Sequence, residues 1–192
     1  MKKTFLALLL AFGCYASNAQ EATTTEPRAR FGIKAGINSS GLNTHNEEAQ
    51  LSSIESFYAG GIAVFPVSKH FNIQSELIFS GEGSKTSGVK LDLGYVRLPI
   101  LFQYEHNSGF HAEAGPQIGI LVHKKAIQEV TKEEFEIGDQ LTQVSTTIAI
   151  GFGYRMKNGL GIDFRYAKGI DNPIGANNAK LVVASGGLSF IF

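Results

Sequence analysis

The feature that most constrains this chain is the alternation of apolar with polar or small residues in one segment after another. In 71–80, Phe71, Ile73, Leu77 and Phe79 alternate with polar side chains. Successive side chains of a β-strand point to opposite faces, so this pattern predicts strands with one apolar and one polar face. Similar segments predict eight strands, at about 30–39, 56–66, 70–81, 91–105, 109–121, 142–155, 159–169 and 180–192. We therefore expect an all-β chain, with a weak hint of helical periodicity confined to 124–136.

Two of these segments alternate less regularly. In 56–66 residues of both parities are apolar, and we expect the larger side chains on the outer face and the small ones on the inner face. This assignment puts Tyr58, Ile62 and Val64 outside, and Ala59, Gly61 and Ala63 inside. In 91–105 the parity slips near Gly94 and Tyr95, which indicates a β-bulge or a late strand start.

The connections alternate in length along the chain. Long polar loops are expected at 40–55, 82–90, 122–141 and 170–179, and short turns at 67–69, 106–108 and 156–158. Asn and Gly in the short turns supply the positive φ that tight hairpins need. An even number of antiparallel strands with short turns at one end and long loops at the other is typical of an outer-membrane barrel. We therefore predict an eight-stranded up-and-down transmembrane β-barrel, with short periplasmic turns and long extracellular loops.

The distribution of aromatic and charged residues predicts which face of the barrel meets lipid. Aromatic residues on the apolar face gather near the strand ends, as interfacial girdles require. Near the short turns these are Phe31, Phe71, Phe102, Tyr104, Phe110, Phe152, Tyr154, Phe190 and Phe192, and near the other end Phe79, Phe164 and Tyr166. The opposite face carries charges in mid-strand, which are costly in lipid but can pair inside a lumen. The apolar face is therefore expected outside.

The inward charges form a candidate network in the lumen. They are Lys34, Glu76, Arg97, Glu113, Asp163 and Arg165. The interior of an eight-stranded barrel is just wide enough for side chains to fill it. Glu76 and Arg97 lie on adjacent predicted strands, and we expect them to form a buried pair.

The two ends of the chain carry export signals. Lys2 and Lys3 precede a short apolar run at 4–12, and small residues precede Gln20, so 1–19 is predicted to be a cleavable signal peptide. The alternative is lipoprotein processing at Cys14. The polar segment 20–29 is expected to form a flexible periplasmic tail, and 30–192 the barrel. The last strand ends in Phe190 and Phe192, which resembles the signal read by the barrel assembly machinery.

Composition argues against several other classes of function. The formal net charge is zero, which gives no electrostatic footprint for nucleic acid. Removal of 1–19 leaves no Cys, and so excludes thiol catalysis and disulfides. His111 and Glu113 share the lumen face, where a hydrogen-bonded wall pair is favoured over a metal ligand or a base with its orienting group. We therefore expect no enzyme activity, and no catalytic residue, metal site or cofactor.

Several short motifs carry a resemblance to a known family. The stretch 60–80 resembles the second hairpin of the PorT-like "outer membrane protein beta-barrel domain" family, and Tyr95–Leu101 resembles its Tyr-Leu-x-Ile-Pro-Leu segment. Ala114–Pro116 and Gly32–Asn38 also fit, and the similarity covers about 31–192. Arg97 stands where the family often has an acidic residue. The resemblance implies a membrane barrel and no single shared activity, although some members take part in protein secretion.

These observations predict a structural or surface-interaction protein of the outer membrane. Its expected partners are outer-membrane lipids, the barrel assembly machinery and an extracellular or envelope protein that binds its loops. Two alternatives are a narrow porin-type channel and a soluble periplasmic barrel that binds an apolar ligand.

The export prediction can be checked by intact-mass spectrometry of the purified protein. The mature chain is expected to start at Gln20 and to carry no acyl group. A mass that corresponds to a lipid-modified chain starting at Cys14 would establish the lipoprotein alternative instead.

Overall fold

Nearly all described residues lie in β-strands. The computed structural model describes residues 28–43, 53–86, 89–128, 134–135, 143–170 and 180–192. The long strands are β1 (Arg30–Asn43), β2 (Ile54–Pro66), β3 (Phe71–Thr86), β4 (Val89–Glu105), β5 (Phe110–Gln128), β7 (Val144–Arg155), β8 (Leu160–Gly169) and β9 (Lys180–Ile191). A short strand, β6 (Glu134–Phe135), pairs with Ala126 and Ile127 of β5. None of the described residues forms a helix long and apolar enough to cross a membrane. The predicted signal peptide and most of the predicted tail lie outside the described residues.

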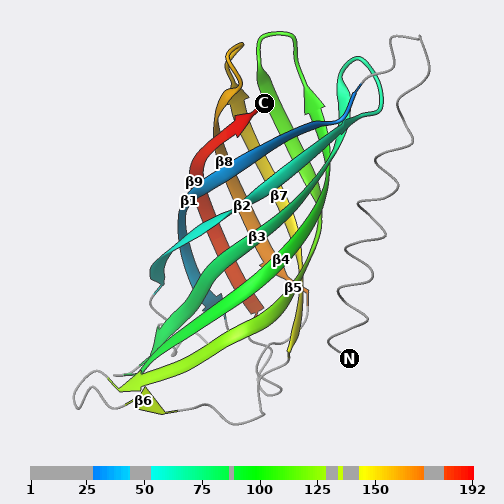
Figure 1. Ribbon diagram of the computed structural model, residues 1–192. Helices are drawn as coiled ribbons and strands as arrows, with labels where there is room; N and C mark the ends of the chain where they lie inside the picture. The colour runs from blue at the N-terminus through cyan, green and yellow to red at the C-terminus, as the bar shows by residue number, and fades with distance from the viewer. Residues whose placement is uncertain (1–27, 44–52, 87–88, 129–133, 136–142, 171–179) are drawn as a thin grey trace, which may run out of the picture.

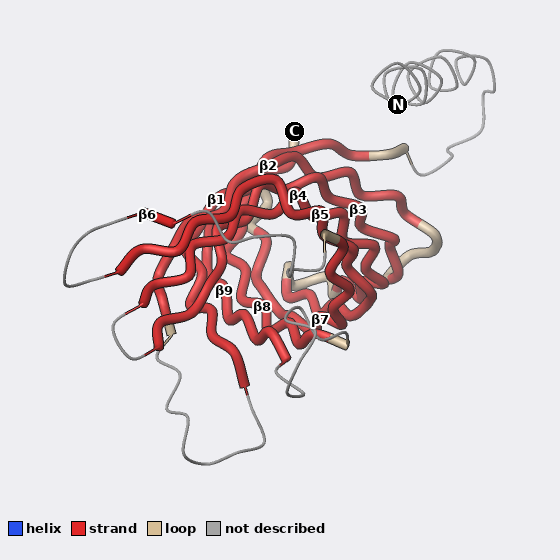
Figure 2. The backbone as a smooth tube through the Cα atoms, turned by 90° about the horizontal axis from the view of Figure 1, so that it is seen from below, coloured by secondary structure: helices blue, strands red, loops and turns tan. Residues whose placement is uncertain are grey.

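The eight long strands close into an antiparallel barrel. Each pairs with its neighbours along the chain, β7 follows β5 in the ring, and β9 pairs with β1 to complete it. Figure 1 shows the tilted strands from the side, and Figure 2 shows the ring along its axis. The predicted number of strands and their antiparallel order are confirmed.

At two of the three short turns a Gly has the predicted positive φ. The amide of Gly109 donates to the carbonyl of His106 at 2.9 Å. The amide of Gly159 donates to the carbonyl of Met156 at 3.0 Å. These two glycines have φ values of 97° and 89°. L side chains rarely adopt such values, so Gly favours the tight return of the chain at both hairpins.

The outer surface is apolar, as predicted, and the interior holds the buried polar and charged side chains together with small apolar clusters such as that of Ile62, Val64 and Ile191. Ile37, Ile150 and Phe152 are 69 %, 59 % and 56 % exposed, whereas buried polar side chains line the inside. In a soluble barrel with an apolar ligand site the two faces would be reversed. The structure thus contradicts the soluble apolar-ligand alternative.

The predicted orientation of 56–66 is wrong. Tyr58, Ile62 and Val64 are buried inside the barrel, whereas Phe57 and Phe65 of the same strand point outward. The small residues predicted inside do not line the interior, since Ala59 and Gly61 are exposed and Ala63 is half-buried. The alternation in the sequence could not show which face of this segment points inward, because both faces are apolar.

Glycines on the neighbouring strands explain why Tyr58 fits inside. A Cβ built on Gly36 would lie 2.8 Å from the Tyr58 ring, and a Cβ on Gly187 would contact the Tyr58 hydroxyl. The absence of side chains at Gly36 and Gly187 thus leaves room for the phenol in the lumen.

The irregularity predicted near Gly94 is a β-bulge. Gly94 pairs with His123 and Tyr95 pairs with Leu121, so Val122 of β5 is the additional residue. Leu93, Tyr95 and Arg97 of β4 all lie on the inner face, so the irregularity is in β5 and the alternation of β4 is not interrupted.

The aromatic residues predicted for the outer face are exposed there, but one of them does not fit the predicted division into two girdles. Phe164 lies directly opposite Phe152 in the β7–β8 register, and their rings stack with centroids 5.5 Å apart. Phe164 therefore shares a level with Phe152 of the short-turn side. The position of a residue along its own strand does not fix its level in the barrel, because that level also depends on the register between neighbouring strands.

Three strands continue past the closed part of the barrel on the long-loop side. The β2–β3 pairing ends at Tyr58 and Ser80, but β3 pairs with β4 as far as Thr86. Likewise the β5–β7 pairing ends at Ile120, but β5 pairs with β4 as far as Gln128. Residues 81–84, 93 and 94 still contact the lumen, and we call the part beyond them, residues 85–86, 89–92 and 122–128 with β6, the sheet arm (Figure 1). Because 124–128 are in β5 and 134–135 in β6, the predicted hint of helix is wrong for the described part of 124–136.

A charge placed on the outer face tests whether lipid covers it. Ile150→Arg is expected to destabilise the barrel by about 2–4 kcal/mol, because a cation on the lipid face of a membrane barrel loses its hydration. Asn107→Arg, in an exposed short turn, is the matched control and should change stability little. Urea unfolding from lipid vesicles measures both, and equal stability of the two variants would contradict a lipid-covered outer face.

Candidate functional site

All six residues of the predicted network point into the lumen. Lys34, Glu76, Arg97, Glu113 and Asp163 are buried, and the Arg165 side chain is 8 % exposed. The structure does not unite them in one group. Four of them meet near the middle of the barrel, while Arg97 and Asp163 have separate partners.

The middle of the lumen holds a cluster built around Arg165. This central cluster consists of Lys34, Gln74, Glu76, Glu113 and Arg165, which come from β1, β3, β5 and β8. The Arg165 guanidinium donates from Nη1 and Nη2 to the two oxygens of Glu76, at 2.8 and 2.7 Å. It also donates from Nε to Glu113 at 2.9 Å. Arg165 of β8 thus binds one carboxylate from β3, across the ring from it, and one from β5.

Two further donors complete this cluster. Lys34 Nζ lies 3.1 Å from Glu76 Oε1, and Gln74 Nε2 donates to Glu76 at 2.7 Å and to Glu113 at 3.1 Å. Two cations thus face two carboxylates. Buried carboxylates are tolerated when they are paired and hydrogen-bonded in this way.

The predicted pair of Glu76 with Arg97 is wrong. Arg97 instead binds Glu82 through Nε and Nη2, and its guanidinium lies 4.6 Å from the centre of the Tyr95 ring. Ser80 donates to the same carboxylate at 2.8 Å. Glu82 was missed because 82–90 was predicted to be a loop, although the alternation of Ser80, Glu82 and Ser84 continues the strand pattern.

His111 also has a different partner from the one predicted. Its Nε2 lies 2.9 Å from Asp163 Oδ1, while Glu113 belongs to the central cluster. No group of three His, Cys, Asp or Glu side chains that could hold a metal occurs among the described residues. The arrangement is that of a hydrogen-bonded wall pair.

A further cluster, which the prediction missed, lies at the short-turn end. Glu105 Oε2 accepts from Arg30 at 2.9 Å, from Arg155 at 3.0 Å and from Asn72 at 2.9 Å. These residues come from four strands at or near their ends, so only closure of the barrel brings them together. We call this group the short-turn cluster.

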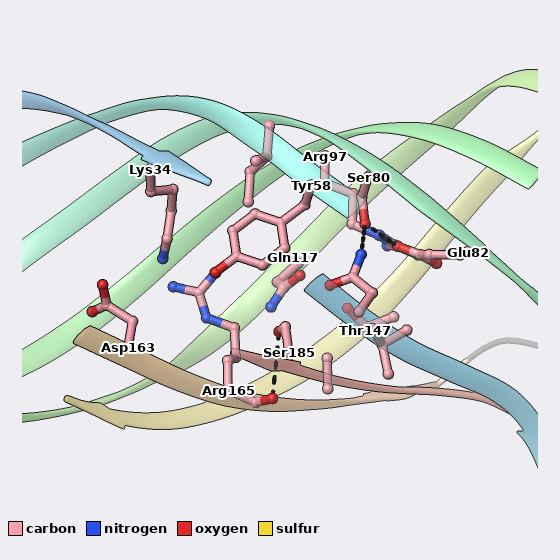
Figure 3. A pocket seen from close by; sticks show the side chains of 14 residues that line it. Lys34, Tyr58, Ser80, Glu82, Arg97, Gln117, Thr147, Asp163, Arg165 and Ser185 are labelled. Atoms are coloured by element: carbon pink, nitrogen blue, oxygen red, sulfur yellow. Dashed lines mark hydrogen bonds and ion pairs between the residues drawn. The ribbon is translucent and has the colours of Figure 1, made fainter. Parts of the chain in front are cut away.

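Little space remains between the clusters. A cavity of about 30 Å³ lies between the central cluster and the Glu82–Arg97 pair, and Figure 3 shows side chains from opposite walls pointing into it. About 10–15 Å³ of such space holds one water molecule, so this cavity takes about two or three. Gln117 Nε2 and Thr147 Oγ1 line it without a protein partner among the described residues, and they are suitable groups to bind that water. In this region the lumen is filled by side chains.

The residues of the predicted assembly signal lie on the outer face of the last strand and its end. Phe190 is 39 % exposed and Phe192 76 % exposed, with their ring centroids 5.7 Å apart. Recognition by the assembly machinery stays a prediction.

An apolar outer surface around a polar, ion-paired lumen defines this molecule as a small outer-membrane β-barrel. The sequence model of the family described as "Outer membrane protein beta-barrel domain" matches residues 18–175, and the chain belongs to that family. No curated protein matches the chain in sequence.

Solved structures of outer-membrane proteins share the fold. Neisserial surface protein A has a TM-score of 0.55 at 13 % identity, and the match covers 86 % of this chain and 99 % of that one. Ail, the attachment invasion locus protein of Yersinia pestis, in complex with the heparin analogue sucrose octasulfate, has a TM-score of 0.52 at 12 % identity, with coverage of 86 % and 99 %. At these identities the likeness shows the fold alone.

Removing the cation of the central cluster tests its energetic role. Arg165→Gln is expected to cost about 3–5 kcal/mol, because Glu76 and Glu113 lose the charge that neutralises them inside the lumen. The triple variant Arg165→Gln, Glu76→Gln, Glu113→Gln should recover most of this loss. Urea unfolding in detergent measures both. If the triple variant is no more stable than the single one, charge balance is not what stabilises this cluster.

Proposed function

We propose that this protein is a non-enzymatic outer-membrane barrel whose long-loop end contacts a partner at the cell surface. The observation that carries the proposal is the sheet arm, which continues beyond the ends of the β2–β3 and β5–β7 pairings. A barrel needs no such extension to cross the bilayer. The arm therefore offers a rigid surface outside the membrane, where a recognition surface is of use.

The filling of the lumen supports this role over that of a channel. The central cluster, the Glu82–Arg97 pair and the short-turn cluster each join side chains from more than one position around the wall. Solutes would have to break these ion pairs to pass. The narrow porin-type channel is thus the less favoured function.

The finer family assignment and the export route belong to this proposal. We place the chain in the PorT-like branch on its Tyr95–Leu101 and Ala114–Pro116 motifs. We also propose cleavage of 1–19, delivery to the outer membrane by the assembly machinery through Phe190 and Phe192, and contact of the outer face with lipid. The name of Ail refers to attachment and invasion, so this fold is compatible with a surface-interaction role.

Accessibility labelling of intact cells tests the orientation on which this function depends. Cys14 is the single Cys of the sequence and is lost with the proposed signal peptide, so one introduced Cys can be labelled specifically. Lys85→Cys in the sheet arm is expected to react with a membrane-impermeant maleimide on intact cells. Asn107→Cys in a short turn should react only after the outer membrane is permeabilised.

The opposite labelling pattern would place the sheet arm in the periplasm and remove the basis of the proposed function. Equal labelling of both positions on intact cells would show that the two ends of the barrel do not lie on opposite sides of the outer membrane.

A further inference from the structure

The short-turn end of the barrel contains an open hollow that the proposed function does not use. It has a volume of about 750 Å³ and lies among the three short turns and the strand ends. We call it the vestibule. The short-turn cluster contributes to its lining, and Lys69 and Lys157 of the turns line it as well.

The short-turn cluster carries more positive than negative charge. Two guanidinium groups and one amide, from Arg30, Arg155 and Asn72, donate to a single oxygen of Glu105. One carboxylate neutralises one cation, so one positive charge is left over. Nε of Arg30 and Nε of Arg155 are buried and have no hydrogen-bond partner among the described residues, so protein acceptors do not satisfy either guanidinium completely.

This imbalance is local. Deeper in the lumen the central cluster pairs two cations with two carboxylates, and Arg97 forms an ion pair with Glu82. At the vestibule four basic side chains face one acidic side chain, which leaves positive charge in excess. A concave site with walls of low dielectric concentrates the field of such charges and attracts anions.

Exposure identifies the residue that an incoming anion can reach. The Arg155 side chain is 6 % exposed and anchors Glu105, whereas the Arg30 side chain is 36 % exposed. A guanidinium presents several N–H groups in one plane, which suits the paired oxygens of a phosphate or carboxylate. Lys69 and Lys157 can add attraction from the rim.

We propose that the vestibule binds an oxyanion, a phosphate or carboxylate group of a solute that enters from the short-turn side. Arg30 is the main contact, Arg155 and Glu105 hold its position, and Lys69 and Lys157 supply attraction that salt screens. The site is separate from the sheet arm, which lies at the opposite end of the barrel. The proposal therefore does not depend on the proposed surface function.

Isothermal titration of the full mature protein in a non-ionic detergent tests this site, with pyrophosphate and citrate as separate probes. We expect saturable binding of at least one probe that weakens as sodium chloride is raised. Arg30→Gln should weaken it by about tenfold or more, the loss expected for a hydrogen bond to a charged group. Lys69→Gln with Lys157→Gln should weaken it less and reduce its salt dependence.

The matched control is Lys124→Gln in the sheet arm, which removes the same charge at the other end and should leave binding unchanged. Binding of pyrophosphate alone assigns the site to phosphate groups, and binding of citrate alone assigns it to carboxylates. The proposal is overturned if neither probe binds saturably, or if Arg30→Gln and Lys124→Gln have the same effect. A folded barrel on an unboiled gel, required of each variant, separates a lost site from a lost fold.

Discussion

The placement of Arg165 between Glu76 and Glu113 is the interaction on which the interior depends. The outer face of the barrel is apolar, so the charges in the middle of the strands lie inside, where little water is present to solvate them. Glu55 and Lys168, which lie near the long-loop ends of β2 and β8, are exposed. Glu76 of β3 and Glu113 of β5 lie two strands apart in the ring, and Arg165 comes from β8, which lies across the ring from β3. The ion pairs therefore join the walls as well as neutralising the charges. Removing one member would leave its partners buried and unpaired, which is far more costly than never having placed them there.

Shape and charge fill the rest of the lumen together. Gly36 and Gly187 leave room for the Tyr58 ring, and Gly119 leaves room for Arg97, since a Cβ there would lie 2.7 Å from Arg97 Nη1. Small residues on one strand thus receive large or charged side chains from others. The water-sized cavity that remains, lined by polar groups of Gln117 and Thr147, fits this packing. A barrel filled in this way gains rigidity at the expense of a passage, which is consistent with a function located on its ends.

The strand number, the strand order and the positions of the turns could be predicted from local patterns. Strand alternation, turn residues and loop lengths can each be recognised within a short stretch of the sequence. The same reasoning placed Lys34, Glu113 and Arg165 on the inner face. It did not find which side chains meet. Arg165 and Glu76 are 89 residues apart, and their contact depends on how the strands are staggered when the ring closes. The misassigned pair of Glu76 with Arg97 came from considering adjacency without that stagger, and Tyr58 was misplaced because its own segment is apolar on both faces.

Single-channel recording in planar lipid bilayers tests the central claim, that ion-paired side chains close the lumen. The purified wild-type protein should show no steady conductance over a wide range of voltage. Replacing Glu76, Glu113 and Arg165 together with Ala should produce openings, because the central cluster would no longer occupy the middle of the barrel. Steady, large conductance by the wild-type protein would contradict the account and would return the channel to the leading function.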